Sequence, residues 1–333
     1  MITLAIETSC DETSVAVIKD GREILSNIIS SQIEIHREYG GVVPEIASRK
    51  HVENIDAIIE ESLNTADVGF EDIDFISVTQ GPGLVGALLV GLSSAKALAY
   101  ALRIPIVGVN HIEGHISANY IAHPDLAPPF ICLVVSGGHS YLIDVLDYNE
   151  FKLYGRTRDD AAGEAFDKVA RALGLPYPGG PFIDELALKG NPAAIDFPRI
   201  FLENNSYDFS FSGLKTAVLN YLNSLAQKNE KPVIEDVAAS FQQAVLDVML
   251  EKSFRLIKQT GRDKLVIAGG VAANKGLREM FQSRGETDNI KIYYPPIVLC
   301  TDNAAMIGSA GYYNFVGMKT SPLDMKVMPN LGL

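Results

Sequence analysis

The sequence predicts an α/β protein made of two mixed lobes, and two observations carry that prediction. A group of three short strands joined by tight connections occurs near the N-terminus and again from residue 130. After each group, helical and strand patterns alternate, as they do in a sheet that is partly parallel. With 333 residues, 47% of them apolar and 21% charged, the chain is long enough for two domains that each bury a core.

The first strand group begins at residue 2. An apolar strand at 2–6 leads through a polar loop at 7–13 into a second strand at 14–18. The tight turn Asp20-Gly21 then returns the chain into a third strand at 22–25. The remaining patterns of this half predict helices at 43–63 and 84–101 and strands at 73–78 and 104–109.

The second strand group repeats this plan. Strands at 130–135 and 140–146 flank the short loop 136–139, and a turn at 147–149 leads into a third strand at 151–154. Helices are expected near 161–173, 213–225 and 234–259 and after Val271, with strands at 264–268 and 290–293.

Two lobes with duplicated β-hairpin units are typical of the actin-like (ribonuclease H-like) folds, which include sugar kinases and Hsp70 ATPases. In that architecture, the first hairpin loops of the two lobes face one another across a nucleotide cleft. By this analogy, we expect residues 1–110 to form the N-terminal lobe, with a C-terminal helix at 303–333 packing back on it. Residues 111–302 would form the C-terminal lobe, with helical insertions.

Composition narrows the classes of function. The net charge of −13 and a pI near 4.9 argue against broad non-specific nucleic-acid binding, so any RNA contact must use a local patch or a partner. Three distant cysteines, Cys10, Cys132 and Cys300, predict buried thiols in a reducing compartment. No apolar run approaches the roughly twenty residues of a membrane span, and the first residues are too acidic for a signal peptide. We therefore expect a cytoplasmic protein.

His111 and His115 are the first candidate metal ligands. Two imidazoles four residues apart share one helix face and can bind the same ion. A zinc protease would need a glutamate directly after the first histidine, whereas Glu113 lies on another face. The alternative is a helix start with two solvated histidines, and a third ligand would decide between the two.

Asp302 is the candidate third ligand. It precedes a run of small residues that predicts the start of a helix. Asp302 could therefore be an ordinary helix cap instead of a ligand. Two histidines and one carboxylate leave open coordination positions, which suits catalytic iron or zinc. Such an ion could also touch a substrate phosphate.

Two glycine pairs are candidate phosphate loops. Ser136-Gly137-Gly138 would let backbone N–H groups approach an anion, and Gly269-Gly270 lies between a strand and a helix start. Either pair alone also fits a plain tight turn.

Residues 81–86 form a G-x-G-x-x-G pattern between a strand and a helix. No acidic residue follows about twenty positions later to hold a ribose, so we interpret this loop as a close-packed turn.

Five motifs in order resemble one known family. They are IETSCDET at 6–13, GPGL at 81–84, NHIEGH at 110–115, VSGGH at 135–139 and GGVAAN at 269–274. They resemble the TsaD family, the bacterial tRNA adenosine threonylcarbamoyltransferases, over nearly the whole chain. The resemblance implies transfer of a threonylcarbamoyl group from threonylcarbamoyl-AMP to the exocyclic amine of adenosine 37, in tRNAs that read codons beginning with adenosine. AMP leaves.

Carried over position by position, the resemblance implies three sets of residues. The metal ligands would be His111, His115 and Asp302, with iron as the expected ion and zinc or magnesium able to substitute. The phosphate and carbamoyl end of the adenylate would lie on Val134, Val135, Ser136, Gly137 and Gly138, and its adenosine end on Asp167, Gly180, Asp184 and Asn274. For Asp167, pairing with Lys168 or Arg171 along a helix is the alternative.

The resemblance also implies partners and nucleotide ligands. These are tRNA, a smaller paralogous actin-like subunit and a small P-loop-type ATPase, while a separate enzyme makes the adenylate. ATP, ADP or AMP would bind as nucleotide ligands. Positive groups that could follow a tRNA backbone, although each could simply be a solvated surface charge, are Arg49, Lys50, Arg156, Arg158, Lys168 and Arg171.

The transfer needs a base because adenine's exocyclic amine is a poor nucleophile. We hypothesise that Asp11 or Glu12 takes this role, since both lie on the first hairpin loop. The runner-up function is an ATP-dependent small-molecule kinase or ATPase of the same fold, which would leave His111 and His115 unexplained.

Overall fold

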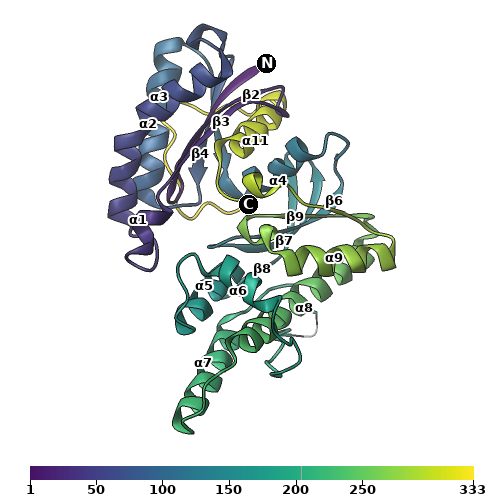
Figure 1. The fold of residues 1–333 in the computed structure, drawn as a ribbon. Helices are drawn as coiled ribbons and strands as arrows, with labels where there is room; N and C mark the ends of the chain where they lie inside the picture. The colour runs from purple at the N-terminus through teal and green to yellow at the C-terminus, as the bar shows by residue number, and fades with distance from the viewer. Residues whose placement is uncertain (204) are drawn as a thin grey trace. The chain divides into compact units, whose positions relative to one another are not determined.

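The computed structural model of the chain describes residues 1–203 and 205–333, which divide into two compact units (Figure 1). Unit 1 comprises Met1–Pro128, Asp147–Glu150 and Pro295–Leu333. Unit 2 comprises Pro129–Leu146 and Phe151–Tyr294. This division differs from a boundary at residue 110, because the helix that starts at His111 packs on the C-terminal helix within unit 1.

The sheet of unit 1 has five strands in the order β3-β2-β1-β4-β5. Strands β1, β2 and β3 pair antiparallel, and β4 and β5 extend the sheet in parallel from β1. Their bounds are β1 Ile2–Glu7, β2 Glu12–Lys19, β3 Glu23–Ser31, β4 Phe75–Gly81 and β5 Ile106–Asn110. Every residue of β1 after Ile2 is buried, as expected of a central strand covered on both faces.

Helices cover both faces of this sheet, as Figure 1 shows. On one face, α2 (Pro44–Ala66) and α3 (Val85–Leu102) pack on Leu4 and Ile6. On the other face, α4 (His111–Ala122) and α11 (Ala304–Val316) lie, and α11 packs on Ala5. Alternate residues of β1 thus serve two cores. Short elements are α1 Ile33–Arg37, the 3₁₀ turn η1 Phe70–Asp72 and α10 Ile297–Cys300.

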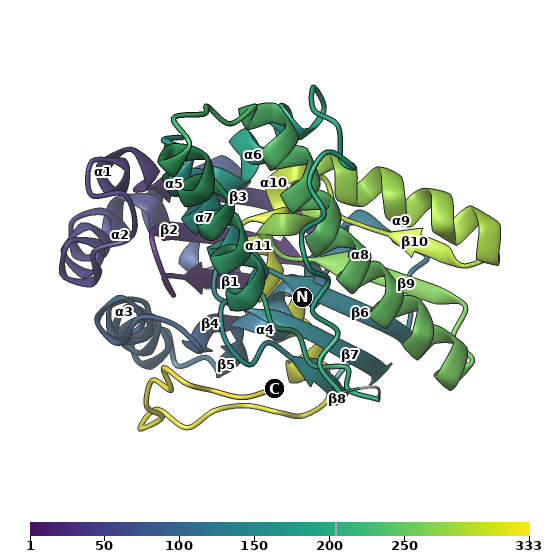
Figure 2. The same ribbon diagram turned by 90° about the horizontal axis from the view of Figure 1, so that it is seen from below.

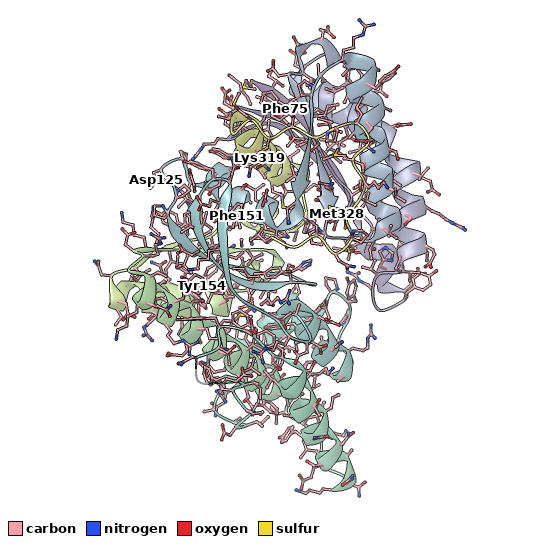
Figure 3. The ribbon with its side chains drawn as sticks, turned by 180° about the vertical axis from the view of Figure 1, so that it is seen from behind. Phe75, Asp125, Phe151, Tyr154, Lys319 and Met328 are labelled. Atoms are coloured by element: carbon pink, nitrogen blue, oxygen red, sulfur yellow. The ribbon has the colours of Figure 1, made fainter. Side chains whose placement is uncertain are left out.

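The C-terminal helix is shorter than the expected 303–333, since α11 ends at Val316. Residues 317–333 form no further helix and bind the end of β4 and the loop that follows it. Met328 N donates to Gln80 O at 2.8 Å, and Gly83 N donates to Pro329 O at 3.1 Å. Met328 is labelled on this segment in Figure 3.

This arrangement explains the glycine pattern at 81–86. A side chain on Gly81 would clash with the carbonyl oxygen of Met328, and one on Gly83 would clash with Ser9. Leu84 N also donates to Ser9 O at 2.8 Å. The loop contacts the chain's own backbone, so the prediction of a close-packed turn is confirmed.

The sheet of unit 2 repeats the plan, with strand order β10-β9-β6-β7-β8. Strands β6 and β7 pair antiparallel, and β9 and β10 extend the sheet in parallel from β6. Their bounds are β6 Phe130–Val135, β7 Ser140–Asp147, β8 Glu150–Arg156, β9 Lys264–Ala268 and β10 Lys291–Tyr293. The predicted duplication of the hairpin unit is therefore confirmed; the cleft that would join the two lobes stays a prediction.

The helices of unit 2 include one long core helix and several insertions, seen from below in Figure 2. Helix α8 packs on β6 and β9, and α9 packs on β10. Helices α5, α6 and α7 form the insertions. The bounds are α5 Ala162–Ala172, α6 Gly179–Ala187, α7 Ser212–Gln227, α8 Ile234–Thr260, the 3₁₀ turn η2 Gly270–Ala273 and α9 Lys275–Asp288.

The expectations for thiols and membrane spans have different outcomes. None of Cys10, Cys132 and Cys300 forms a disulfide with a described residue; Cys132 and Cys300 are buried, as predicted, whereas Cys10 is partly exposed. By length and composition, however, the 18 residues of α3 could cross a membrane, which corrects the expectation that no run approaches this limit. A core helix passes the same test, and α3 buries Leu88 and Leu92 in unit 1.

Candidate functional site

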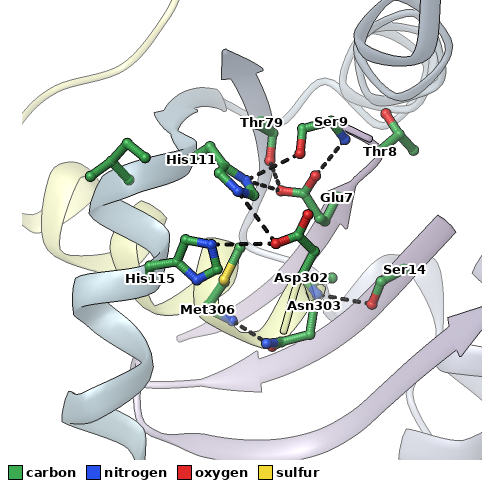
Figure 4. Close-up of polar contacts among 12 residues, drawn as sticks. Glu7, Thr8, Ser9, Ser14, Thr79, His111, His115, Asp302, Asn303 and Met306 are labelled. Atoms are coloured by element: carbon green, nitrogen blue, oxygen red, sulfur yellow. Dashed lines mark hydrogen bonds and ion pairs between the residues drawn. The ribbon is translucent and has the colours of Figure 1, made fainter. Parts of the chain in front are cut away.

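His111 and His115 lie in the first turns of α4, where both side chains are buried (Figure 4). Asn110 begins this helix, because its side-chain oxygen accepts a hydrogen bond from Ile112 N at 2.9 Å. The two imidazole rings meet edge to face, with centroids 4.7 Å apart. With only 5% and 1% of their surface exposed, they are not the solvated histidines of the alternative reading.

Asp302 lies close to these histidines, two residues before α11 begins at Ala304. The cap of α11 is Asn303, whose side-chain oxygen accepts from Met306 N, so Asp302 is not the helix cap. Its Oδ1 lies 3.4 Å from His111 Nε2 and 3.3 Å from His115 Nε2. Figure 4 shows the three side chains converging.

This cluster has the donor set of a divalent metal site. One ligand atom from each of the three side chains lies within 4.8 Å of the others. Neither ring nitrogen of His115 has a hydrogen-bond partner among the described residues, although Nε2 lies 3.3 Å from Asp302 Oδ1. Buried polar atoms without a partner are costly, and an ion bound by two imidazoles and a carboxylate would remove that cost for Nε2.

Glu7 is a further member of the cluster that sequence reasoning did not single out. Its Oε2 lies 3.1 Å from His111 Nδ1 and accepts a hydrogen bond from Thr79 Oγ1 at 2.6 Å. Because a carboxylate only accepts, Nδ1 of His111 carries a proton toward Glu7, whereas Nε2 faces the Asp302 carboxylate and would lose its own proton on binding a metal. The sequence feature that could have indicated Glu7 is its position in the motif at 6–13, directly after the apolar strand predicted at 2–6.

The charges of the cluster are strongly coupled. Burial alone would lower the pKa of His111, but the Asp302 and Glu7 carboxylates hold it well above its usual value. Burial likewise opposes ionisation of Asp302, yet the two histidines hold its pKa well below the usual range. Burial lowers the pKa of His115, which therefore favours the neutral imidazole that a metal needs.

Asp11 lies on the first hairpin loop of unit 1, as predicted, whereas Glu12 is the first residue of β2. Glu12 is 9% exposed; its Oε1 accepts from Ser31 Oγ, and its Oε2 has no partner among the described residues. Burial, aided by the Asp11 charge, raises the pKa of Glu12 to about 8. Burial also raises the pKa of Asp11.

A buried histidine on α2, His51, holds this loop in place. Its Nε2 donates to Cys10 O at 2.9 Å, so its Nδ1 accepts from Thr13 Oγ1 at 2.7 Å. Burial lowers the pKa of His51, in keeping with the neutral ring. Nothing in the helical pattern of residues 43–63 indicated this contact.

In unit 2, the loop 136–139 is open at its glycines. A Cβ added to Gly137 or Gly138 would meet nothing within 4 Å. The loop is closed by hydrogen bonds from Ser136 N to His139 O and from Gly163 N to Ser136 O. Val134 and Val135 are fully buried in β6, so they can offer only main-chain groups.

Asp167 and Gly180 meet at the start of α6. Asp167 Oδ1 accepts from Gly179 N at 2.7 Å, and burial raises the pKa of this carboxyl although the Gly179 and Gly180 N–H groups oppose the rise. Lys168 pairs with Asp160 at 2.7 Å instead of with Asp167. Gly180 faces open space.

Asp184 and Asn274 meet at the start of α9 through a residue that the sequence did not indicate, Gln242. Gln242 Nε2 donates to Asp184 Oδ1 at 3.1 Å, and its Oε1 accepts from Asn274 Nδ2 at 2.7 Å. Asp184 also accepts from Lys275 N, and Asn274 caps the helix through Leu277 N. These three side chains fix the beginning of α9 beside Gly270, which faces open space.

Half of the predicted positive groups are engaged in ion pairs. Lys50 pairs with Glu53, Lys168 with Asp160, and Arg158 with both Glu203 and Asp208. Arg49, Arg156 and Arg171 are exposed.

Each unit has the duplicated-hairpin sheet of the actin-like ATPase fold, and unit 1 adds a buried histidine-carboxylate cluster suited to a metal. HypF of T. kodakarensis superposes with a TM-score of 0.63 at 14% identity, over 95% of this chain and 48% of that one. Component A of (R)-2-hydroxyglutaryl-CoA dehydratase from Acidaminococcus fermentans gives 0.54 at 18% identity, over 94% and 97%. At these identities the similarity shows the fold alone.

Sequence comparison is more specific. The family model of TsaD, tRNA N6-adenosine threonylcarbamoyltransferase, matches residues 23–309. The tRNA N6-adenosine threonylcarbamoyltransferase of Clostridioides difficile strain 630 is 62% identical over 331 residues, 99% of this chain and 98% of that protein. Its counterpart in Clostridium perfringens strain 13 is 60% identical over 332 residues, 100% and 98%.

The chain therefore belongs to the TsaD family of tRNA N6-adenosine threonylcarbamoyltransferases. It is a transferase that modifies tRNA, as the five motifs predicted.

Proposed function

We propose that this chain transfers the threonylcarbamoyl group of threonylcarbamoyl-AMP to the exocyclic amine of adenosine 37, in tRNAs that read codons beginning with adenosine. The observation that carries the proposal is the convergence of two buried histidines, His111 and His115, with the partly buried Asp302 in a chain of this family. A kinase or ATPase of the same fold would have no use for two buried imidazoles beside a carboxylate.

His111 Nε2, His115 Nε2 and an oxygen of Asp302 would hold one divalent ion per subunit. Two imidazoles with one carboxylate favour Fe²⁺ or Zn²⁺ over Mg²⁺, which prefers oxygen ligands, and we propose Fe²⁺. When bound, the ion would supply a Lewis acid that offsets charge on the phosphate of departing AMP. Glu7 would keep His111 in the ligating tautomer.

The residues of unit 2 would bind the adenylate. The backbone N–H groups at Gly137 and Gly138 and the Ser136 hydroxyl would bind its phosphate and carbamoyl oxygens, while Val134 and Val135 anchor this loop in the sheet. Asp167 keeps one carboxylate oxygen available for the ribose hydroxyls.

Gly180 would let the backbone pass close to the adenosine. Asp184 and Asn274 would contribute to adenosine binding indirectly, because their hydrogen bonds hold the N-terminus of α9 in position. ATP, ADP or AMP could occupy the same residues.

Glu12 would act as the general base, with Asp11 as the second candidate. In the reaction, the adenine nitrogen forms a bond to the carbamoyl carbon, and the bond from that carbon to the phosphate oxygen breaks with its electrons leaving on AMP. The proton lost by the amine would pass to the unpartnered Oε2 of Glu12. A pKa near 8 makes this carboxylate a stronger base than an exposed glutamate.

We further propose that the chain works in the cytoplasm with helpers. Its net charge of −13 disfavours tRNA binding by the chain alone, so a smaller paralogous actin-like subunit and a small P-loop-type ATPase would complete the system. The adenylate would come from a separate enzyme.

The deciding experiment measures transfer of labelled threonylcarbamoyl from its adenylate to an unmodified tRNA that reads such codons, with the partners present. His111→Ala, His115→Ala and Asp302→Ala should each lose bound metal and transfer. His123→Ala, a change at the end of the same helix, should retain both. Wild-type-level transfer in all three cluster variants, or none by the wild type, would refute the proposal.

A further inference from the structure

A polar pocket lies in unit 2 between the start of β7 and the end of β8. Its walls include His139, Tyr141, Arg156, Thr157, Arg158 and Asp208. His139 directly follows Gly138, the last residue of the loop that we propose to hold the carbamoyl group. Gly138 itself lines the pocket, and Arg156 and Arg158 are among the positive groups expected to follow a tRNA backbone, whereas no role described above uses His139 or Tyr141.

An aromatic surface forms one side of the pocket. The rings of His139 and Tyr141 stack with centroids 5.6 Å apart and an angle of 17° between their planes. Both side chains are partly exposed. Flat stacked rings with an accessible face are the usual support for an unpaired nucleobase.

Of the two arginines that line the pocket, Arg156 has a positive charge that is available to a ligand, whereas Arg158 is engaged in ion pairs. Arg158 is held by Glu203 at 2.9 Å and by Asp208 at 2.8 Å. The other oxygen of Asp208 accepts from the backbone N of Arg156 at 3.0 Å. The Arg156 guanidinium is exposed and forms no ion pair with the described residues. It lies close enough to oppose the rise that burial causes in the pKa of Tyr141.

We propose that this pocket binds a tRNA nucleotide that flanks the target adenosine, with its base stacked on the Tyr141–His139 pair and its phosphate on Arg156. The inference rests on the proposed function, since the target amine must reach the loop that ends at Gly138. It also resolves how an acidic chain can position RNA, because one stacked base and one phosphate contact need no basic surface.

The test compares Tyr141→Phe, Tyr141→Leu and Arg156→Ala in the complete system, with separate KM values for tRNA and for threonylcarbamoyl-AMP. Tyr141→Phe keeps the ring and should stay within about twofold of wild type, whereas Tyr141→Leu should raise the KM for tRNA about tenfold. Arg156→Ala should raise it and reduce its salt dependence by about one phosphate contact. The KM for the adenylate should not change.

Matched controls and a direct probe separate binding from folding. Tyr221→Leu removes an aromatic ring that pairs with Phe197 elsewhere in unit 2, and Lys228→Ala removes an exposed charge directly after α7; neither should change the KM for tRNA. A tRNA carrying 5-iodouridine immediately 5′ or immediately 3′ of the target adenosine should cross-link to Tyr141, and the yield should fall in Tyr141→Leu.

The outcomes distinguish the two proposals. If the wild type transfers no threonylcarbamoyl, the proposed function fails. If the wild type is active but the variants change only the KM for the adenylate, or change neither KM, the pocket does not bind RNA. A cross-link that maps outside residues 138–158 would also overturn the inference.

Discussion

Glu7 and His111 form a buried carboxylate-imidazole pair, with Glu7 Oε2 3.1 Å from His111 Nδ1. The two residues come from a strand end and a helix start that are 104 positions apart in the chain. Thr79 and Ser9 donate further hydrogen bonds to the same carboxylate, so its orientation is fixed. The pair directs Nε2 of His111 toward Asp302. A carboxylate bound to one imidazole nitrogen commonly orients the other nitrogen for metal binding in this way.

Glu7→Gln should therefore weaken metal binding about 10- to 100-fold without unfolding the protein. An amide can no longer accept from Ser9, Thr79 and His111 together, so His111 loses its fixed tautomer. Chelator competition followed by metal analysis gives the affinity. Glu113→Gln is the matched control, since Glu113 lies on the same helix but accepts from Asn314. Equal metal affinity in the two variants would show that Glu7 does not position the ligand.

Gly137→Ala and Gly138→Ala should fold normally and bind the adenylate poorly. Added methyl groups meet nothing within 4 Å in the protein, so only a ligand lying against the loop would clash with them. We expect an unchanged melting temperature and at least a tenfold loss in affinity for a non-hydrolysable adenylate analogue, measured by calorimetry. Gly213→Ala, at an exposed helix position where the added methyl would make only ordinary contacts with Ile200, should bind normally. Tight binding by both loop variants would remove this loop from the site.

Glu12 should make stability depend on pH in a defined direction. Its pKa is about 8 in the folded protein against 4.5 for an ordinary glutamate, so the folded state holds the proton more tightly. The resulting stabilisation is complete below about pH 4.5 and is lost as the pH rises through about 8. Urea unfolding at pH 5, 7 and 9 should show that the wild type loses stability relative to Glu12→Gln over this range.

The same pKa predicts the pH dependence of transfer. If Glu12 is the base, turnover with bound adenylate should increase with pH up to about 8 and then level off. Glu12→Gln should lower turnover and abolish that rise, while Glu23→Gln, at an exposed position, should change neither. A rise that persists in Glu12→Gln would assign the base to another group.

Gln242→Leu should destabilise unit 2 by about 1–3 kcal/mol, because buried polar groups of Asp184 and Asn274 would lose their partner. The adjacent Gln243 donates to Asp247 at a partly exposed position, so Gln243→Leu should cost less than about 1 kcal/mol. Denaturant unfolding measures both. Equal costs would show that the hydrogen bonds of Gln242 do not hold the start of α9.

Several features followed from local patterns. The shared face of His111 and His115 depends only on helical periodicity, and the open loop at Gly137 and Gly138 depends on glycine between two apolar strands. The repeated hairpins were readable for the same reason, since strand alternation and turn residues act over a few positions. Short elements such as α1 and α10 were not predicted, because five and four residues are too few to show a helical period.

Tertiary packing decided which distant groups meet. Asp302 could have capped a helix by its local sequence, but Asn303 caps α11, and Asp302 faces two histidines from a distant helix. Glu7 and Gln242 gained their roles only through partners far away in the chain. Residue type and spacing determine what chemistry a segment can offer, whereas the pairing of buried charges depends on how sheets and helices stack.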